Sequence, residues 1–415
     1  MDRTLAPAFR TLVDFELPTP EKINLGSDKP PILYLPYTQT PIVKIEFVFA
    51  AGKLYEAQPG LAQFTVNLLD KGTSSNNAKE IASTLDYYGA LLELTNDADF
   101  AYISLYCLSD HIKILLPLVI SILSEPSFPE EELNTYKQIF TENLKVNQGK
   151  NSYLATVALR KAIFKKHPYG RNTEIEDALR ITKQHVEAFF KKHYNLLSVF
   201  VTGSINEPEL STLSKFCNGF SKTHSSQSID FIELAVEDHT FDGPGKDQAS
   251  IRFGKITLDR KNKQIANLTL LNHILGGFFG SRLMKNIREE KGLTYGIYSS
   301  ISHFKQASLF SIGAEVNTQN VEEAKREILT EISKLQNISG EEVQIAKNHL
   351  IGSMQNDNAS IFNIAERIKV VELNGLNADY YSALSKAINS CSGQELVEIA
   401  QIELNPSSLC AVVVK

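Results

Sequence analysis

The sequence predicts an α+β protein built from two related domains. The chain has 415 residues, and single hydrophobic cores stop growing near ~250–300 residues, so more than one domain is expected. In both halves, short strand patterns alternate with longer helix patterns. The strand pattern PIVKIEFVFAAG at 41–52 places Val43, Ile45, Phe47 and Phe49 on one side, as a half-solvated strand does. Such strands favour antiparallel sheets that helices cover on one face.

An internal repeat supports the same prediction. Segments of the first half recur in the second at an offset of about 210 positions, and a fixed offset indicates duplicated units. A turn residue and acidic residues open the helix patterns PEEELNTYKQIF (129–140) and SGEEVQIAKNHL (339–350). The other matched pairs are an amphipathic helix at 185–194 and 395–404, the strand after it at 195–201 and 405–411, and a strand–break–helix unit at 102–123 and 308–332. We expect each domain to contain an antiparallel sheet of five or six strands.

The boundary between the domains is predicted from composition. SKTHSSQSID at 221–230 is polar, and DHTFDGPGKDQ at 238–248 is rich in turn formers. We therefore assign residues 1–220 to an N-terminal domain, 221–247 to an exposed linker and 248–415 to a C-terminal domain.

Composition argues against several classes of partner. Hydrophobic residues make up 43% of the chain, charged residues make up 22%, and the net charge is −6. Neither nucleic acid nor an anionic membrane is therefore expected as a partner. No apolar run approaches the ~20 residues that span a bilayer, and the first residues show no apolar signal region. The four cysteines are scattered without a CxxC pair, which favours free, buried thiols. We expect a cytoplasmic protein.

The stretch GLAQFTVNLLDKGT (60–73) predicts a helix with polar residues at the positions of a metal site. Gln63 and Asn67 are four residues apart and share one helical face, with Val66 beside them. Inverted zinc peptidases carry His, Glu and His at this spacing. A carboxamide is a poor zinc ligand, and valine can neither bind zinc nor accept a proton. The expected core face of the helix consists of Leu61, Phe64, Leu68 and Leu69.

The most specific pattern of the second half is LGGFFGSRLMKNIREEKGLTYGIYSS (275–300). Three glycines within 276–280 predict a flexible turn before a helix that begins near Ser281. Gly292 can end that helix in the left-handed conformation, and a strand is expected from Thr294. A phosphate-binding loop is disfavoured, because no lysine–serine pair follows and no dinucleotide-type unit surrounds the glycines.

Both stretches resemble the pitrilysin/insulinase family of zinc metallopeptidases. GLAQFTVNLLDKGT is similar to that family's zinc helix, of the form GLAHFLEHMLFKGT, and LGGFFGSRLMKNIREEKGLTYGI looks like its C-terminal signature. HPYG at 167–170, the FFKKHYN that follows, and AKNHLIGSM at 346–354 also resemble family patterns. The likeness extends from about residue 30 to the end of the chain. It implies two homologous domains that form half of a clamshell around a peptide.

The resemblance also implies that the zinc site is lost. The family's two zinc-binding histidines match Gln63 and Asn67, and the glutamate between them, which activates water, matches Val66. A further glutamate ligand, ~75 residues on, matches Asn143, or Glu142 if the register slips by one. None of the nine histidines forms an HxxH or HxxxH pair. We therefore expect this chain to bind no metal and to hydrolyse no peptide by itself.

The substrate-binding residues of the family are matched better. Family members bind the substrate carbonyl with an arginine and, seven residues on, a tyrosine, and Arg288 and Tyr295 have this spacing in IREEKGLTY. Such groups stabilise a developing oxyanion, although an REEK helix is otherwise most often a solvated, salt-bridged face. The further substrate-binding candidates are Gly276 and Gly277 in the glycine-rich turn, and Leu92 and Leu94 in a strand pattern that fits peptide addition or simple burial.

The resemblance leaves two functions open. The chain matches the zinc-less subunit of a heterodimeric zinc metallo-endopeptidase, which would supply Arg288 and Tyr295 opposite the zinc site of a homologous partner. That partner would carry an intact His-x-x-Glu-His motif and the zinc, and the substrates would be short unfolded peptides. The alternative is a catalytically inactive structural or peptide-binding homologue, which could form a homodimer.

Overall fold

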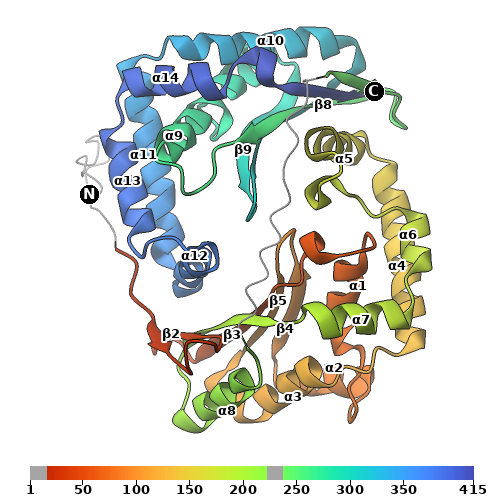
Figure 1. Cartoon of the computed structure of the whole chain (residues 1–415). Helices are drawn as coiled ribbons and strands as arrows, with labels where there is room; N and C mark the ends of the chain where they lie inside the picture. Colours follow the sequence, from red (N-terminus) through yellow and green to blue (C-terminus); the bar gives the residue numbers. More distant parts are fainter. Residues whose placement is uncertain (1–15, 222–236) are drawn as a thin grey trace, which may run out of the picture.

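The computed structural model describes residues 16–221 and 237–415, which form two lobes, each with one sheet (Figure 1). The first sheet has six strands in the order β1-β2-β6-β3-β5-β4, and the second has five in the order β7-β11-β8-β10-β9. The strands of the first sheet are β1 (Glu21–Ile23), β2 (Ile32–Pro36), β3 (Ile42–Phe49), β4 (Leu91–Asn96), β5 (Ala101–Leu108) and β6 (Leu196–Gly203). Those of the second are β7 (His239–Phe241), β8 (Gln248–Thr257), β9 (Thr294–His303), β10 (Ser308–Asn317) and β11 (Cys410–Val414). The predicted α+β class and strand numbers are confirmed.

Helices follow the strands in the same succession in both lobes, apart from α8, which has no counterpart in the second lobe. The first lobe contains α1 (Leu61–Asn67), α2 (Ala78–Tyr87), α3 (Ile112–Ser124), α4 (Glu130–Gln148), α5 (Asn151–Phe164), α6 (Ile175–Arg180), α7 (Lys183–His193) and α8 (Glu207–Asn218). The second contains α9 (Ile265–Gly276), a π-helix (Met284–Glu290), α10 (Val321–Ser333), α11 (Gly340–Asn356), α12 (Ile361–Asn374), α13 (Tyr380–Ser390) and α14 (Gly393–Glu403). Thr182 and Ser392, about 210 positions apart, each cap the helix that follows by accepting a backbone N–H bond. The helix starts therefore repeat with the sequence.

The duplication extends to the topology of the sheets. If β1 is left out, the strand order is the same in both sheets. The strands β2, β6, β3, β5 and β4 of the first sheet correspond to β7, β11, β8, β10 and β9 of the second. All neighbours are antiparallel except β2 with β6 and β7 with β11, which are parallel. The prediction of purely antiparallel sheets is wrong for this one pair in each lobe. In both lobes a long connection through the helices, rather than a hairpin, separates the two parallel strands.

The half-solvated strand predicted at 41–52 is in fact buried on both faces. Val43, Ile45 and Phe47 point into the main core of the first lobe, as the alternation indicates. Lys44 and Glu46, on the opposite face, are also buried. They lie under α12, which comes from the second lobe.

Each lobe thus covers the inner face of the other lobe's sheet with one helix. Ala365 and Ile368 of α12 pack with apolar residues of the first sheet, and Ala155 and Leu159 of α5 pack against β11 of the second. Helices α5 and α12 occupy equivalent positions, since they begin about 120 residues after the equivalent strands β2 and β7 and are about 210 positions apart. Figure 1 shows α5 below the second sheet and α12 above the first.

A closed ring of four charged side chains anchors α12 to β3. Lys44 lies 3.1 Å from Glu46 and 2.6 Å from Glu366, and Lys369 lies 2.8 Å from Glu46 and 2.6 Å from Glu366. Burial alone would lower the pKa of Lys44, but the charges of Glu46 and Glu366 hold it above its ordinary value. The polar inner face of β3 therefore forms ion pairs with α12 instead of being hydrated.

The second lobe repeats this contact in a simpler form. Arg252 of β8 corresponds to Lys44, and Thr156 of α5 corresponds to Glu366. Arg252 Nε donates to Thr156 Oγ1 at 3.3 Å, and Arg252 Nη2 lies 2.7 Å from Glu315. A buried cation on the central strand therefore meets the exchanged helix in both lobes.

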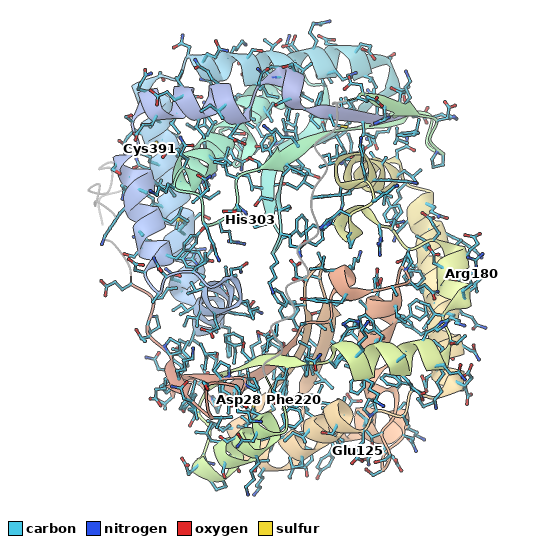
Figure 2. The ribbon with its side chains drawn as sticks, in the orientation of Figure 1. Asp28, Glu125, Arg180, Phe220, His303 and Cys391 are labelled. Carbon is cyan, nitrogen blue, oxygen red and sulfur yellow. The ribbon has the colours of Figure 1, made fainter. Side chains whose placement is uncertain are left out.

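Residues 222–236 of the predicted linker lie outside the described residues. His239–Phe241, at the end of that linker, form β7 and pair with β11, so this part is a strand of the second sheet, although Thr240 and Phe241 are exposed. Strand β8 begins at Gln248, where the second domain was predicted to begin. Cys107, Cys217, Cys391 and Cys410 are unpaired and buried as predicted, with Cys391 between α13 and α14 (Figure 2). In the ranges that the structure describes, no helix is long and apolar enough to cross a membrane.

Candidate functional site

Helix α1 is short and is fixed at its start by a buried carboxylate. Gly60 has a φ of 90°, which favours glycine, and the next residue begins the helix. Glu56 Oε2 accepts a hydrogen bond from Ala62 N at 3.1 Å. Burial raises the pKa of Glu56 to about 7, against the opposing effect of this backbone bond. The predicted core face is confirmed, since all four of its members belong to the main core: Leu61, Phe64, Leu68 and Leu69.

The polar residues of α1 bond locally and to α4. Asn67 Nδ2 donates to the carbonyl of Gln63 at 2.8 Å, and Val66 is fully buried. The Gln63 side chain hydrogen-bonds the phenol of Tyr136, whose pKa burial raises to about 12. The Tyr136 ring also packs edge-on against Phe64, with 4.8 Å between centroids. These side chains join α1 to α4.

The residues at the family's zinc positions do not fit a zinc ion. Asn143 is exposed on α4, and Glu142, the alternative residue, is 70% exposed and pairs with Lys145 at 2.8 Å. Within residues 16–221 and 237–415, no three or more His, Cys, Asp or Glu side chains gather where they could hold a metal ion. The donors offered by α1 are two carboxamides, which are poor ligands for zinc.

The glycine-rich turn is tightly packed rather than flexible. A Cβ on Gly276 would lie 2.6 Å from the backbone nitrogen of Ser299, and one on Gly277 would lie 2.7 Å from the Cα of His273. Neither glycine has a positive φ. Gly276 therefore lets α9 approach β9 closely, and the prediction of a flexible turn is wrong for these two residues.

Arg288 and Tyr295 lie at the edge of the second sheet. The helix predicted from Ser281 is a π-helix over most of its length, a form that often occurs at functional sites. It ends near Gly292, whose φ of 62° matches the prediction. Arg288 lies over the ring of Phe279, 4.7 Å from its centroid, and Tyr295 is 94% exposed at the start of β9.

The π-helix contacts β9, and β9 is an edge strand of its sheet. Within the described ranges, no carboxylate pairs with Arg288, so this arginine does not belong to a salt-bridged surface. Phe279 orients the guanidinium, and sequence reasoning missed it. The only signal for it was its place in the glycine-rich pattern.

Leu92 and Leu94 lie in β4, the edge strand of the first sheet, which contacts α1. Both side chains pack against the main core. The residues on the other face are Leu91, which is 53% exposed, Glu93 and Thr95. The free backbone edge of β4 is therefore the feature available to an extended peptide, while Leu92 and Leu94 hold the strand in place.

Known proteins resemble this chain over nearly its full length. The model of insulinase (peptidase family M16) matches residues 32–177, and that of the peptidase M16 inactive domain matches residues 180–350. The uncharacterized zinc protease YmxG of Bacillus subtilis is 24% identical over 303 residues, covering 71% of this chain and 73% of that protein. The non-peptidase homolog YmxG of Helicobacter pylori is 24% identical over 417 residues, covering 95% and 94%.

Solved structures show the same fold. The peptidase M16 inactive domain from Pseudomonas fluorescens superposes with a TM-score of 0.87 at 22% identity, covering 95% of this chain and 98% of that chain. A protease from Helicobacter pylori gives a TM-score of 0.84 at 17% identity, covering 96% and 100%. The two family models together span most of the described residues, and α1 lacks the zinc ligands of the family. The chain therefore belongs to the insulinase family, peptidase family M16, as a homologue without a zinc site.

Proposed function

We propose that this chain is the zinc-less subunit of a heterodimeric zinc metallo-endopeptidase in the cytoplasm. The observation that carries the proposal is the exposed pair at the edge of the second sheet. Tyr295 is 94% exposed, and Arg288 is stacked on Phe279 instead of pairing with a carboxylate in the described ranges. An exposed phenol and an unpaired guanidinium contribute little to this chain's own stability, which favours a role toward a ligand.

The proposed role is to bind the carbonyl of the peptide bond that is cut. Arg288 and Tyr295 would donate hydrogen bonds to the carbonyl oxygen as it gains negative charge, and donors fixed in advance stabilise that charge most. A homologous partner with an intact His-x-x-Glu-His motif would hold the zinc. The free edges of β4 and β9 supply backbone groups that an extended peptide can pair with. Short unfolded peptides are the substrates that suit this mode of binding.

The test combines this chain with its homologue from the same genome that carries the intact motif. Each chain alone and the mixture are assayed for zinc content and for cleavage of an internally quenched peptide. We expect cleavage only in the mixture, with about one zinc per pair. Zinc-dependent cleavage by this chain alone would overturn the proposal.

One comparison favours a second function. The Helicobacter pylori relative, which aligns with 95% of this chain, is described as a non-peptidase homolog. The second candidate is therefore an inactive structural or peptide-binding protein, as a homodimer or with a partner. It predicts that the mixture binds peptides or assembles without cleaving anything.

A further inference from the structure

A small pocket opens between α5 of the first lobe and the inner face of β9 and β10. Its volume is about 190 Å³. The polar side chains that line it carry two guanidinium groups and four hydroxyls: Arg160, Arg252, Thr156, Tyr298, Ser302 and Ser311. Gly313 forms part of the wall, and a Cβ there would come within 2.8 Å of the Tyr298 hydroxyl. This glycine leaves room for the phenol at the pocket wall.

The two arginines of the pocket differ in their partners. Arg252 is neutralised by Glu315 at 2.7 Å. The Arg160 side chain has neither an ion pair nor a hydrogen bond within residues 16–221 and 237–415, and its Nε is buried without a partner. Its described contact is with the ring of Phe304, whose centroid lies 5.7 Å from Cζ. A half-buried guanidinium whose Nε has no partner and which lacks a counter-charge is costly to keep, which points to a ligand that supplies one.

Lys53, a second cation near Arg160, increases the positive potential around the Arg160 guanidinium. Burial and the nearby charge of Arg160 lower the pKa of Lys53, while Glu56 opposes them. Glu56 is itself a weak counter-ion, because burial raises its pKa to about 7. Lys53 does not line the pocket, but its charge adds to that of Arg160, the arginine of the wall that has no carboxylate partner in the described ranges.

The size and position of the pocket indicate what it holds. Pockets for drug-sized molecules measure roughly 300–1,000 Å³, so this volume suits one short side chain or a chain terminus. Tyr298 lies three residues after Tyr295 on β9, roughly 10 Å along the strand at ~3.4 Å per residue. A peptide that follows the β9 edge would pass the pocket.

We propose that this pocket binds a carboxylate of the bound peptide, with Arg160 as its counter-ion. The planar guanidinium can donate two parallel hydrogen bonds to a carboxylate, and the neighbouring hydroxyls can donate further bonds. The carboxylate is that of the peptide's C-terminus or of an Asp or Glu side chain. The inference rests on the proposed peptide-binding function and adds a preference for peptides that present a carboxylate.

The test measures binding of three N-acetylated peptides to the full chain by calorimetry. One has a neutral sequence with a free C-terminal carboxylate, the second is the same sequence amidated, and the third is amidated with one residue changed to Glu. We expect a peptide with a carboxylate to bind about tenfold more tightly than the neutral one. Arg160→Gln should abolish this preference, and Arg160→Lys should keep part of it. The matched control is Arg180→Gln, which removes an exposed arginine on the outside of the first lobe (Figure 2) and should keep all of it.

The outcomes separate this proposal from the one on which it rests. Tighter binding of the free acid identifies the C-terminus as the ligand, and tighter binding of the Glu peptide identifies a side chain. Equal binding of all three peptides overturns the carboxylate pocket but leaves peptide binding intact. If none binds, to this chain or to its mixture with the zinc-carrying homologue, both proposals fail. The melting temperature of Arg160→Gln without peptide should equal or exceed that of the wild type, and a clear decrease would show that Arg160 stabilises the fold instead.

Discussion

At the residue scale, Tyr295 and Arg288 separate function from stability. Because Tyr295 is 94% exposed, Tyr295→Phe should leave the free energy of unfolding within about 0.5 kcal/mol of the wild type. In the complex with the zinc-carrying homologue, the same change should lower kcat about 100-fold, since it removes one hydrogen-bond donor to the oxyanion. Arg288→Ala should act in the same direction. Turnover is measured with an internally quenched peptide.

The control for this prediction is Tyr87→Phe, which removes the hydroxyl of another exposed tyrosine, 82% exposed on α2. It should leave turnover unchanged. The zinc content of the complex should not respond to any of the three substitutions, because the partner holds the metal. Full turnover in both Tyr295→Phe and Arg288→Ala would refute the assignment of this pair.

A buried histidine beside the glycine-rich turn makes stability depend on pH. His273 Nε2 lies 3.0 Å from His349 Nδ1, and burial, followed by the charge of His349, lowers the pKa of His273 from 6.5 to about 4. Above pH 6.5 the His273 side chain is neutral in both the folded and the unfolded chain. As the pH falls from 6.5 toward 4, the unfolded chain binds a proton that the folded chain does not, so the free energy of unfolding decreases.

We expect His273 to contribute a loss of about 2 kcal/mol between pH 7 and pH 5, at about 1.36 kcal/mol per pKa unit. Urea unfolding at the two pH values measures it, and in His273→Gln the loss should be smaller by that amount. His303, at the end of β9 (Figure 2), has a pKa lowered to about 4 by burial and contributes in the same direction. An equal loss in wild type and variant would contradict the role of His273.

Single residues differ in how far the sequence reveals them. The hydrogen bond from Asn67 to Gln63 could be predicted, because helical spacing of four places the two residues together. Tyr136 and Arg160 could not, since each acquires its role from a contact with a distant segment of the chain. Phe279 stood inside the most specific pattern, but its stacking under Arg288 depends on how the turn folds back.

At the element scale, the ionic ring shows why β3 was misjudged. The alternation along 42–49 correctly predicts a strand and its core face, but a polar opposite face looks the same in the sequence whether it meets water or charges on another helix. Here it meets α12, some 320 residues away along the chain. The helices and the parallel strand pair follow the internal repeat, yet only the three-dimensional pairing shows that each inner helix belongs to the other lobe. The π-helix was predicted in position but not in type, because i→i+5 bonding leaves no pattern in side-chain character.

The ring also predicts a strong effect of one substitution. Glu46→Gln leaves the buried Lys44 and Lys369 with one shared carboxylate, that of the half-exposed Glu366. Breaking a buried charge pair by removing one partner is strongly destabilising, so we expect the free energy of unfolding to fall by about 3 kcal/mol. Urea denaturation measures the change. Glu93→Gln on β4, where the side chain is exposed, should change it by less than about 0.5 kcal/mol. Equal effects of the two substitutions would show that the ring contributes nothing.

At the scale of the whole molecule, the exchanged helices join the lobes into one folding unit. Without α5, the second sheet would expose the inner faces of β8 and β11, and without α12 the first would expose the buried charges of β3. We therefore expect the full chain to unfold in a single transition. Its midpoint should be the same whether unfolding is followed by circular dichroism or by the hydrodynamic size of the chain. Residues 1–221 and 237–415, produced as separate chains so that each keeps all the strands of its own sheet, should each lack a cooperative transition and should regain one when combined. Independent cooperative unfolding of the two halves would contradict this account.

The exchange of α5 and α12 is the arrangement expected if two copies of a half-length chain were fused. Two copies of a chain of half this length, related by a twofold axis, could bury their inner sheet faces only by each lending a helix to the other, as in a domain-swapped homodimer. Fusing the two copies end to end removes the dependence of assembly on concentration, and it frees each copy to change separately. In that case, one contact of the symmetric dimer gave rise to both present contacts, that of Arg252 with Thr156 and the charged ring around Lys44.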